Sequence, residues 1–201
     1  MFSDLLRDDV FRLETARLWL RWPRMADAQS MVRYAGEKQV AEMTATIPHP
    51  YSLSEAEKFI FSCRAGNAAG AQIDLAVTRK AKQGEVIGMI GVHRTRPGHA
   101  VLGYWLAQPF HGQGLMSEAA AAMVDLAYRA GDVEMIAAGA LIENAASRRV
   151  LEKCGFTSSG AAQREHRGER REVVDFRLDR AEWGGMIKTL AHPQAETGAA
   201  A

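Results

Sequence analysis

The sequence predicts a mixed α/β fold, in which a mostly antiparallel sheet is flanked by helices. Three observations lead to this fold class. Two helical patterns follow an N-terminal strand, three candidate strands then succeed one another with turn residues between them, and the remainder alternates helix and strand before a final hairpin. Because strands joined by short turns pair in opposite directions, we expect most of the sheet to be antiparallel.

The N-terminal strand and the first helix are marked by alternation and by helix-ending residues. Residues 16–21 (ARLWLR) alternate polar and apolar side chains and predict a strand that Pro23 stops. A helical pattern follows over residues 24–36, which includes Asp27 and which Gly36 can end.

A capping signature and three apolar runs define the next part of the chain. Ser54 and Glu57 have the spacing of a capping box, which predicts a second helix from about residue 55. Three candidate strands then follow at 71–79, 85–94 and 99–107. The turn residues Gly84 and Pro97-Gly98 separate them.

Residues 115–130 have the periodicity of an amphipathic helix. Its expected apolar face contains Leu115, Ala119, Ala122, Met123, Leu126 and Ala130. Its expected solvent face contains Glu118, Asp125 and Arg129. The C-terminal part is expected to contain a buried strand at 134–142, a helix that Gly155 ends, and strands at 156–165 and 170–179 joined near Gly168.

The composition fits one globular domain spanning residues 1–201, with its core at about 10–185 and a frayed, disordered tail at 191–201. The formal net charge is +1, so nothing global indicates a nucleic acid or an anionic membrane as partner. The N-terminus lacks the pattern of a signal peptide, and no apolar run is long enough to span a membrane. We therefore expect a cytoplasmic protein.

The cysteines and histidines give no sign of a disulfide framework or a metal site. Cys63 and Cys154 lack CxxC spacing, and the six histidines are scattered. We expect two reduced thiols and no bound metal.

The stretch 108–119 (QPFHGQGLMSEA) places two glycines directly before the predicted helix at 115–130. Exposed N–H groups at a helix start, together with the helix dipole, favour an anion there. The stretch lacks the third glycine of a dinucleotide fingerprint, because Ser117 stands in its place, and it lacks the Gly-Lys-Ser/Thr of a P-loop. From residue types alone, this stretch is equally well interpreted as a plain turn or as a ligand-binding loop.

A longer collinear set of segments resembles the GNAT acyltransferases, specifically the ribosomal-protein N-terminal acetyltransferases (the RimJ/RimL-like branch). The segments are 14–28, 47–60, 86–94, 103–119, 134–156 and 171–183. The resemblance implies the acyl-CoA N-acyltransferase fold, with central strands that splay apart, and acetyl-CoA as co-substrate. It also implies that the acceptor is a primary amine, most plausibly the α-amine of a ribosomal protein.

The resemblance also implies a set of cofactor-binding residues. The family's diphosphate loop maps onto His111, Gly112, Gln113, Gly114, Leu115 and Met116, with His111 and Met116 departing from the usual first and last residues. Strand 100–107 would separate from strand 134–142, and a main-chain N–H near Leu106 would meet the acetyl carbonyl. Asn144 would lie beside the coenzyme arm, a role compatible with a simple N-cap.

For catalysis, the resemblance leaves alternatives open. The tyrosine that many GNAT enzymes use as general acid is replaced here by Leu151, so Ser147 is the polar alternative, unless it only makes a local backbone bond. Glu165 is the first candidate for the general base, acting through a water; the alternative is that it is an ordinary solvated surface charge. His93 is the second candidate; the alternative is that it is a packed, hydrogen-bonded histidine.

The acceptor side is expected to involve the stiff loop 47–51, with His49 and Tyr51, and also Tyr104. A rigid surface connector is the alternative for that loop. Two other functions stay open: acetylation of a small amine such as a polyamine, amino acid or aminoglycoside, and coenzyme A binding without turnover. The sequence does not fix the oligomeric state, and a homodimer is left open.

Overall fold

The computed structural model describes residues 2, 4–7 and 9–184, so the predicted tail at 191–201 lies outside the described residues. In chain order the elements are η1 (Asp4–Arg7), β1 (Arg12–Glu14), β2 (Leu18–Arg21), η2 (Met25–Asp27), α1 (Ala28–Ala35), α2 (Lys38–Ala41), α3 (Leu53–Ala69), β3 (Gln72–Arg79), β4 (Lys82–Arg96), β5 (Gly98–Leu106), η3 (Gln108–Phe110), α4 (Leu115–Ala130), β6 (Val133–Leu141), α5 (Ala145–Lys153), β7 (Thr157–His166) and β8 (Glu169–Asp179).

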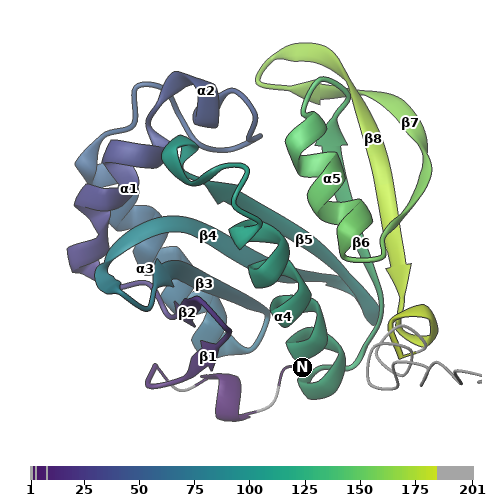
Figure 1. Ribbon diagram of the computed structural model, residues 1–201, viewed down its shortest axis with the longest axis horizontal. Helices are drawn as coiled ribbons and strands as arrows, with labels where there is room; N and C mark the ends of the chain where they lie inside the picture. The colour runs from purple at the N-terminus through teal and green to yellow at the C-terminus, as the bar shows by residue number, and fades with distance from the viewer. Residues whose placement is uncertain (1, 3, 8, 185–201) are drawn as a thin grey trace, which may run out of the picture.

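The strands form one eight-stranded sheet, in which their spatial order is β1-β2-β3-β4-β5-β6-β8-β7 (Figure 1). The pair β5–β6 is parallel, and the other neighbouring strands pair antiparallel. The predicted fold class, a mixed and mostly antiparallel sheet flanked by helices, is therefore confirmed. Among the described helices, none is both long and apolar enough to cross a membrane.

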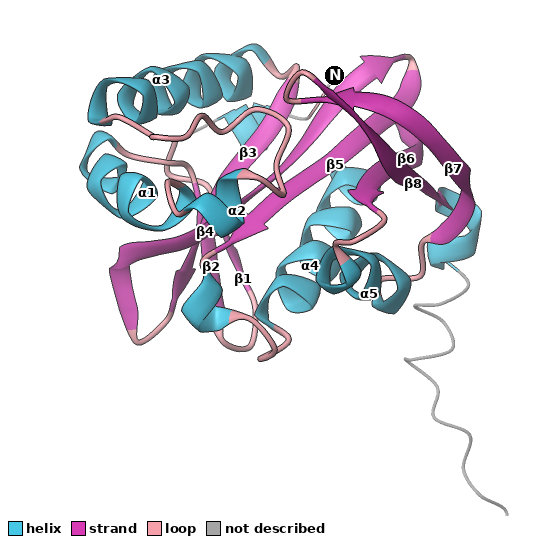
Figure 2. Cartoon of the chain, turned by 90° about the horizontal axis from the view of Figure 1, so that it is seen from above, coloured by secondary structure: helices cyan, strands magenta, loops and turns pink. Residues whose placement is uncertain are grey.

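Helices cover the sheet on both sides (Figure 2). On what we call the first face, α4 and α5 pack on a core that includes Leu20, Leu75, Met123 and Ile136. On the second face, α1 and α3 pack on a smaller core that includes Met31, Ile60, Ala76 and Met89. Successive strand residues point to opposite faces, so this division assigns each strand side chain to one side.

The N-terminal region differs from the prediction in two respects. The short strand β1 was not predicted, and the helix predicted over 24–36 is divided into η2 and α1, with α2 beyond it. Asp27 explains the division: its two carboxylate oxygens each accept a hydrogen bond of 2.8 Å from Arg21, and one also accepts from the Arg24 amide. This buried carboxylate anchors the chain to β2 at the point where α1 begins.

The start of α3 corrects the predicted capping box. The residues that cap it are Ser52 and Glu55, not Ser54 and Glu57. The Ser52 hydroxyl accepts from the Glu55 amide, while the Glu55 carboxylate accepts from the Ser52 amide at 2.8 Å. Both serine–glutamate pairs have the same spacing, and the extended backbone at Ser52 decides between them.

Helix α4 has the predicted bounds, but its buried face is rotated. Leu115, Ala119 and Met123 are buried as expected, and they are joined by Met116, Ala120, Val124, Ala127 and Tyr128. Ala122, Leu126 and Ala130 are only partly buried. Glu118 does not face solvent, because β1 and β2 approach it and it accepts hydrogen bonds from that side.

Candidate functional site

The strands β5 and β6 separate at the centre of the sheet. They pair from Gly98 to Val101, where Val101 lies opposite Ala137, and no pairing follows. Beyond that point β5 stays paired to β4 as far as Leu106, and β6 stays paired to β8. The edge of β5 that faces β6 is therefore open over residues 102–106, which confirms the predicted splay of the central strands.

The glycine loop connects this open edge to α4. Gly112 and Gly114 have φ angles of 74° and 72°, which glycine adopts without the strain that a side chain imposes. In the part of the chain that the structure describes, none of the amides from Gly112 to Met116 donates a hydrogen bond. Five N–H groups at the start of a 16-residue helix are thus available to an anion.

Two side chains in the turn between β1 and β2 hold this loop in place. Arg17 donates to the Gln113 carbonyl at 2.8 Å and to the Glu118 carboxylate at 2.6 Å, and Thr15 donates to the same carboxylate. Burial opposes ionisation of Glu118, but these hydrogen bonds outweigh it and hold the pKa of its carboxyl below the usual value. Arg17 was not predicted as part of the site, and nothing in its local sequence marks it.

His111 supports the loop from the other side. Its Nε2 lies 2.8 Å from the Leu106 carbonyl oxygen and donates to it, since that oxygen can only accept. The ring is exposed and ties the loop to the end of β5.

Asn144, Ser147 and Tyr104 form a polar group on the first face. The Asn144 side chain accepts from the Ser147 amide at 3.0 Å, so its N-cap role is present. The Tyr104 hydroxyl lies 2.9 Å from Ser147 Oγ and 3.1 Å from the Ser147 carbonyl. Burial raises the pKa of the Tyr104 phenol, with a hydrogen bond from Ser147 opposing it, so the phenol stays protonated. Tyr104 was predicted as an acceptor contact, but its side chain points toward α5.

The other predicted acceptor residues lie on the second side of the molecule. His49 Nδ1 is 2.9 Å from the Gly36 carbonyl oxygen, and Tyr51 packs against the core under α1 and α3. Burial raises the pKa of Tyr51 to about 12, with smaller contributions from Cys63 and Glu55. The structure therefore brings His49 and Tyr51 together in one loop, apart from Tyr104.

The tip of the β7–β8 hairpin closes onto the same region. His166 Nε2 lies 2.9 Å from the Glu42 carbonyl oxygen, and Arg167 donates to the carbonyls of Ala41 and Ile47. We call these three contacts the hairpin clasp. It joins the hairpin that carries Glu165 to the segment 41–47, which leads into the predicted acceptor loop at 47–51.

The two candidate bases have different surroundings. Within the described residues, the side chain of Glu165 makes no hydrogen bond or ion pair, and strand alternation points it away from the side of β7 on which His166 contacts the Glu42 carbonyl. His93 lies on the second face, 2.7 Å from the buried carboxylate of Asp74. Asp74 was missed, although an acidic residue inside the apolar run QIDLAV was a usable signal.

Comparisons with known proteins agree with this geometry. Residues 17–157 match the family described as an acetyltransferase (GNAT) domain. YdaF of Bacillus subtilis (strain 168) is 30% identical over 106 residues, which cover 51% of this chain and 58% of that protein. The ribosomal-protein-serine acetyltransferase of Escherichia coli (strain K12) is 31% identical over 81 residues, covering 39% of this chain and 45% of that protein. The chain thus matches about half the length of these two relatives.

Solved structures share the fold. RimJ of Mycobacterium smegmatis, solved in complex with CoA-disulfide, superimposes with a TM-score of 0.74 at 22% identity, covering 87% of this chain and 88% of that one. RimL, a ribosomal L7/L12 α-N-protein acetyltransferase solved with coenzyme A, gives a TM-score of 0.74 at 20% identity and covers 84% of this chain and 98% of that one. Since the family match extends over residues 17–157 and the sheet opens between β5 and β6, this chain belongs to the GNAT acetyltransferases.

Proposed function

We propose that this chain transfers the acetyl group of acetyl-CoA to the α-amine of a protein N-terminus, a ribosomal protein being the favoured acceptor. The observation that carries the proposal is the set of main-chain N–H groups from Gly112 to Met116 that donate no hydrogen bond and lie next to the open edge of β5. The name of the Escherichia coli relative supports the choice of acceptor. Such an acceptor would place the reaction in the cytoplasm.

The open edge and the loop would bind different parts of the donor. Each hydrogen bond to a charged group contributes roughly 1.5–3 kcal/mol, so a few loop amides suffice to hold a diphosphate. The main-chain groups of residues 103–106 that face the gap, apart from the Leu106 carbonyl that His111 occupies, would pair with the amide groups of the pantetheine arm. The N–H near Leu106 would donate to the acetyl carbonyl, and Asn144 would flank the arm. Gln113, Leu115 and Met116 would contribute main-chain donors.

The transfer itself needs a neutral amine, a donor to the oxyanion and a proton for the leaving sulfur. The amine nitrogen would attack the thioester carbonyl carbon, and the C–S bond would break as the tetrahedral oxyanion collapses. Ser147 Oγ would give its proton to the leaving thiolate. The Tyr104 hydroxyl, 2.9 Å behind it, would pass a proton to Ser147 Oγ and take one from solvent in return, so that the phenol ends protonated.

The acceptor side suits an α-amine. An α-amino group has a pKa of about 8 and a lysine side chain about 10.4, so the α-amine costs roughly 3.3 kcal/mol less to deprotonate at neutral pH. The acceptor chain would lie between the loop bearing His49 and Tyr51 and the hairpin, where the hairpin clasp holds the two segments together.

The test follows free thiol release from acetyl-CoA with peptides of varied N-terminal residue, alongside polyamines, amino acids and aminoglycosides. We expect acetylation of peptide N-termini, a kcat at least tenfold lower in Ser147→Ala, and no change in the control Ser158→Ala on exposed β7. If only small amines are acetylated, the acceptor is a small amine and not a protein N-terminus. Coenzyme A binding without turnover on any acceptor would identify a binding module instead.

A further inference from the structure

The guanidinium of Arg17 contacts the glycine loop from the side of the β1–β2 turn. Its Nη1 donates to the Gln113 carbonyl oxygen at 2.8 Å, and its Nε donates to the Glu118 carboxylate at 2.6 Å. A Cβ built on Gly114 would lie 3.6 Å from Nη2, so the third nitrogen packs against the loop. One side chain thus joins the loop before α4 to the first turn of that helix.

The carbonyl that Arg17 holds belongs to the same peptide group as the Gly114 amide. The peptide bond between Gln113 and Gly114 is trans, so the group is planar and its C=O and N–H bonds point in opposite directions. Because Arg17 binds the Gln113 oxygen, the Gly114 hydrogen points to the other side of the loop. Within the described residues, that hydrogen has no acceptor. Arg17 therefore fixes the direction of a donor that it does not touch.

Without this contact the peptide group could rotate in place. Such a rotation changes ψ of Gln113 and φ of Gly114, and glycine adopts φ of either sign. Gly114 has a φ of 72° in the structure. The rotated peptide would turn the Gln113 oxygen, in place of the Gly114 N–H, toward a bound anion. The contact from Arg17 thus selects the orientation that suits an anion.

The β1–β2 turn holds Arg17 itself in position. The Leu18 amide donates to Thr15 Oγ1 at 3.0 Å, and the Thr15 amide donates to the Leu18 carbonyl at 3.1 Å. The Arg17 amide donates to the Glu118 carboxylate at 2.7 Å, and the Arg17 carbonyl accepts from the Lys80 amide at 3.0 Å. The main chain of Arg17 is therefore fixed at both of its polar groups.

Arg17 also balances a negative charge in the first turn of α4. The Glu118 side chain is 17% exposed, and it belongs to the turn whose N–H groups would face the diphosphate. In the part of the chain that the structure describes, Arg17 is the cation paired with this carboxylate, and its further side-chain partner, Thr15, is neutral. Without Arg17, the unpaired carboxylate would repel an anion bound at the start of the helix.

We propose that Arg17 is a positioning residue of the diphosphate site, which aims the Gly114 N–H at the diphosphate of coenzyme A and neutralises Glu118. This inference rests on the proposed function, in which the loop amides bind that diphosphate. A guanidinium presents a planar fork of donors, whereas an ammonium is a point charge. The role therefore requires arginine and not only a positive charge.

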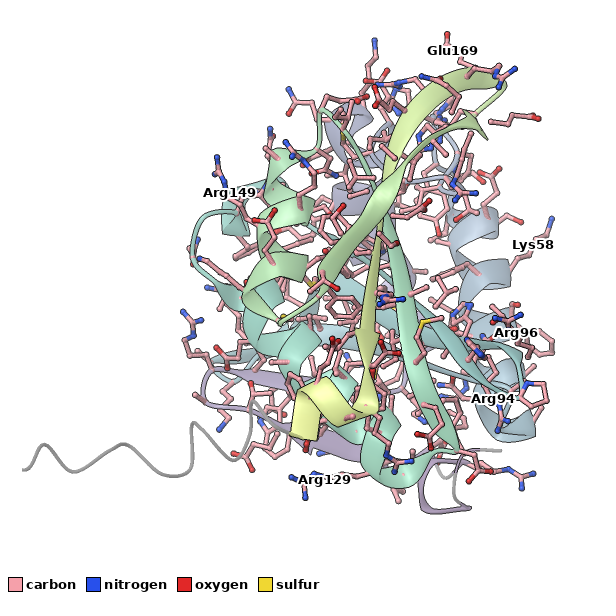
Figure 3. The ribbon with its side chains drawn as sticks, turned by 90° about the vertical axis from the view of Figure 1, so that its right-hand side faces the viewer. Lys58, Arg94, Arg96, Arg129, Arg149 and Glu169 are labelled. Atoms are coloured by element: carbon pink, nitrogen blue, oxygen red, sulfur yellow. The ribbon has the colours of Figure 1, made fainter. Side chains whose placement is uncertain are left out.

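The test compares Arg17→Lys, Arg17→Gln, the double variant Arg17→Gln/Glu118→Gln and the control Arg129→Gln. Arg129 forms an exposed ion pair with Asp125 in the last turn of α4, and Figure 3 shows it at that end of the helix. Calorimetry measures the Kd of coenzyme A, and amide NMR follows the Gly114 N–H during titration with inorganic pyrophosphate. Neither measurement needs an acceptor, so the choice of acceptor amine can fail without affecting the test.

We expect Arg17→Gln to weaken coenzyme A binding about 30-fold, within the range for one hydrogen bond to a charged group. Arg17→Lys keeps the charge without the fork and should still lose about tenfold. The double variant should bind about threefold more tightly than Arg17→Gln, because the charge of Glu118 is gone. Arg129→Gln, an exposed pair, should stay within about twofold of wild type. With any amine that the wild type acetylates, the Arg17 variants should raise KM for acetyl-CoA and leave kcat nearly unchanged.

A negative result separates the proposed function from this inference. If the Gly114 amide of the wild type does not respond to pyrophosphate, the loop is not the diphosphate site, and both are overturned. If that amide responds but Arg17→Gln binds coenzyme A within about threefold of wild type, well below the effect of one such hydrogen bond, this inference alone is overturned. Wild-type affinity in Arg17→Lys would also overturn it, because charge without the fork would then suffice.

Discussion

Replacing Gly112 by alanine tests whether the conformation of the glycine loop is what binds coenzyme A. Gly112 has a φ of 74°, and a Cβ built there meets nothing within 4 Å, so alanine would cause strain without a clash. A left-handed conformation costs a residue with a side chain roughly 1–2 kcal/mol. The free loop can relax to avoid that strain. To bind coenzyme A it must return to the left-handed conformation, so the strain energy is subtracted from the binding free energy.

The expected weakening therefore equals the strain, about 5-fold to 30-fold in Kd, since 1.4 kcal/mol corresponds to about tenfold. Isothermal titration with coenzyme A measures it. Gly168→Ala is a matched control, because Gly168 has a φ of 82° and equally open surroundings but lies in the β7–β8 hairpin. Its variant carries the same backbone conflict away from the loop and should keep its affinity for coenzyme A. If Gly112→Ala binds within twofold of wild type, the loop amides are not the diphosphate site.

Three further outcomes follow from contacts around the site. Asp27→Asn leaves the buried Arg21 guanidinium uncompensated, so urea unfolding should show a loss of about 3–5 kcal/mol; the control Glu14→Gln, in a surface ion pair with Lys80, should lose less than about 1 kcal/mol, and equal losses would contradict this account. Glu118 has a folded-state pKa below its unfolded value, so its contribution to stability is present above about pH 4.3 and is lost as the pH falls through the folded pKa. The unfolding free energies of Glu118→Gln and wild type should thus differ at pH 7 and converge at acidic pH; a constant gap would refute the assigned hydrogen bonds. Tyr104→Phe removes the hydroxyl beside Ser147 and should cost about 1 kcal/mol of stability and lower kcat several-fold, and an unchanged kcat would exclude Tyr104 from the proton path.

Local signals predicted the elements well where they were unambiguous. Gly114 and Gly131 bracket α4, and its bounds are as predicted. The rotation of its buried face was not predictable, because it depends on β1 and β2 approaching Glu118 from a distant part of the sequence. The capping box before α3 was ambiguous within the sequence itself, since two serine–glutamate pairs share one spacing.

The site divides in the same way. The glycine loop and Asn144 follow from short motifs. The structure shows the left-handed glycines and the N-cap, and the binding of coenzyme A by these residues stays a prediction. The pairing of His93 with Asp74 depends on the register of β3 against β4, which brings together residues 19 apart in the sequence. Arg17 supports a loop 96 residues away and has no local signature. Such contacts arise only once the sheet has assembled.

The hairpin clasp contacts only main-chain atoms of the segment 41–47. His166 and Arg167 contact carbonyl oxygens of Ala41, Glu42 and Ile47, and these oxygens are present whatever side chains those positions carry. Side chains in this segment can therefore change while the hairpin clasp persists. If, as we propose, the segment lines the acceptor site, selectivity for amines would diversify by point changes at positions 41–51, with no compensating change in the hairpin.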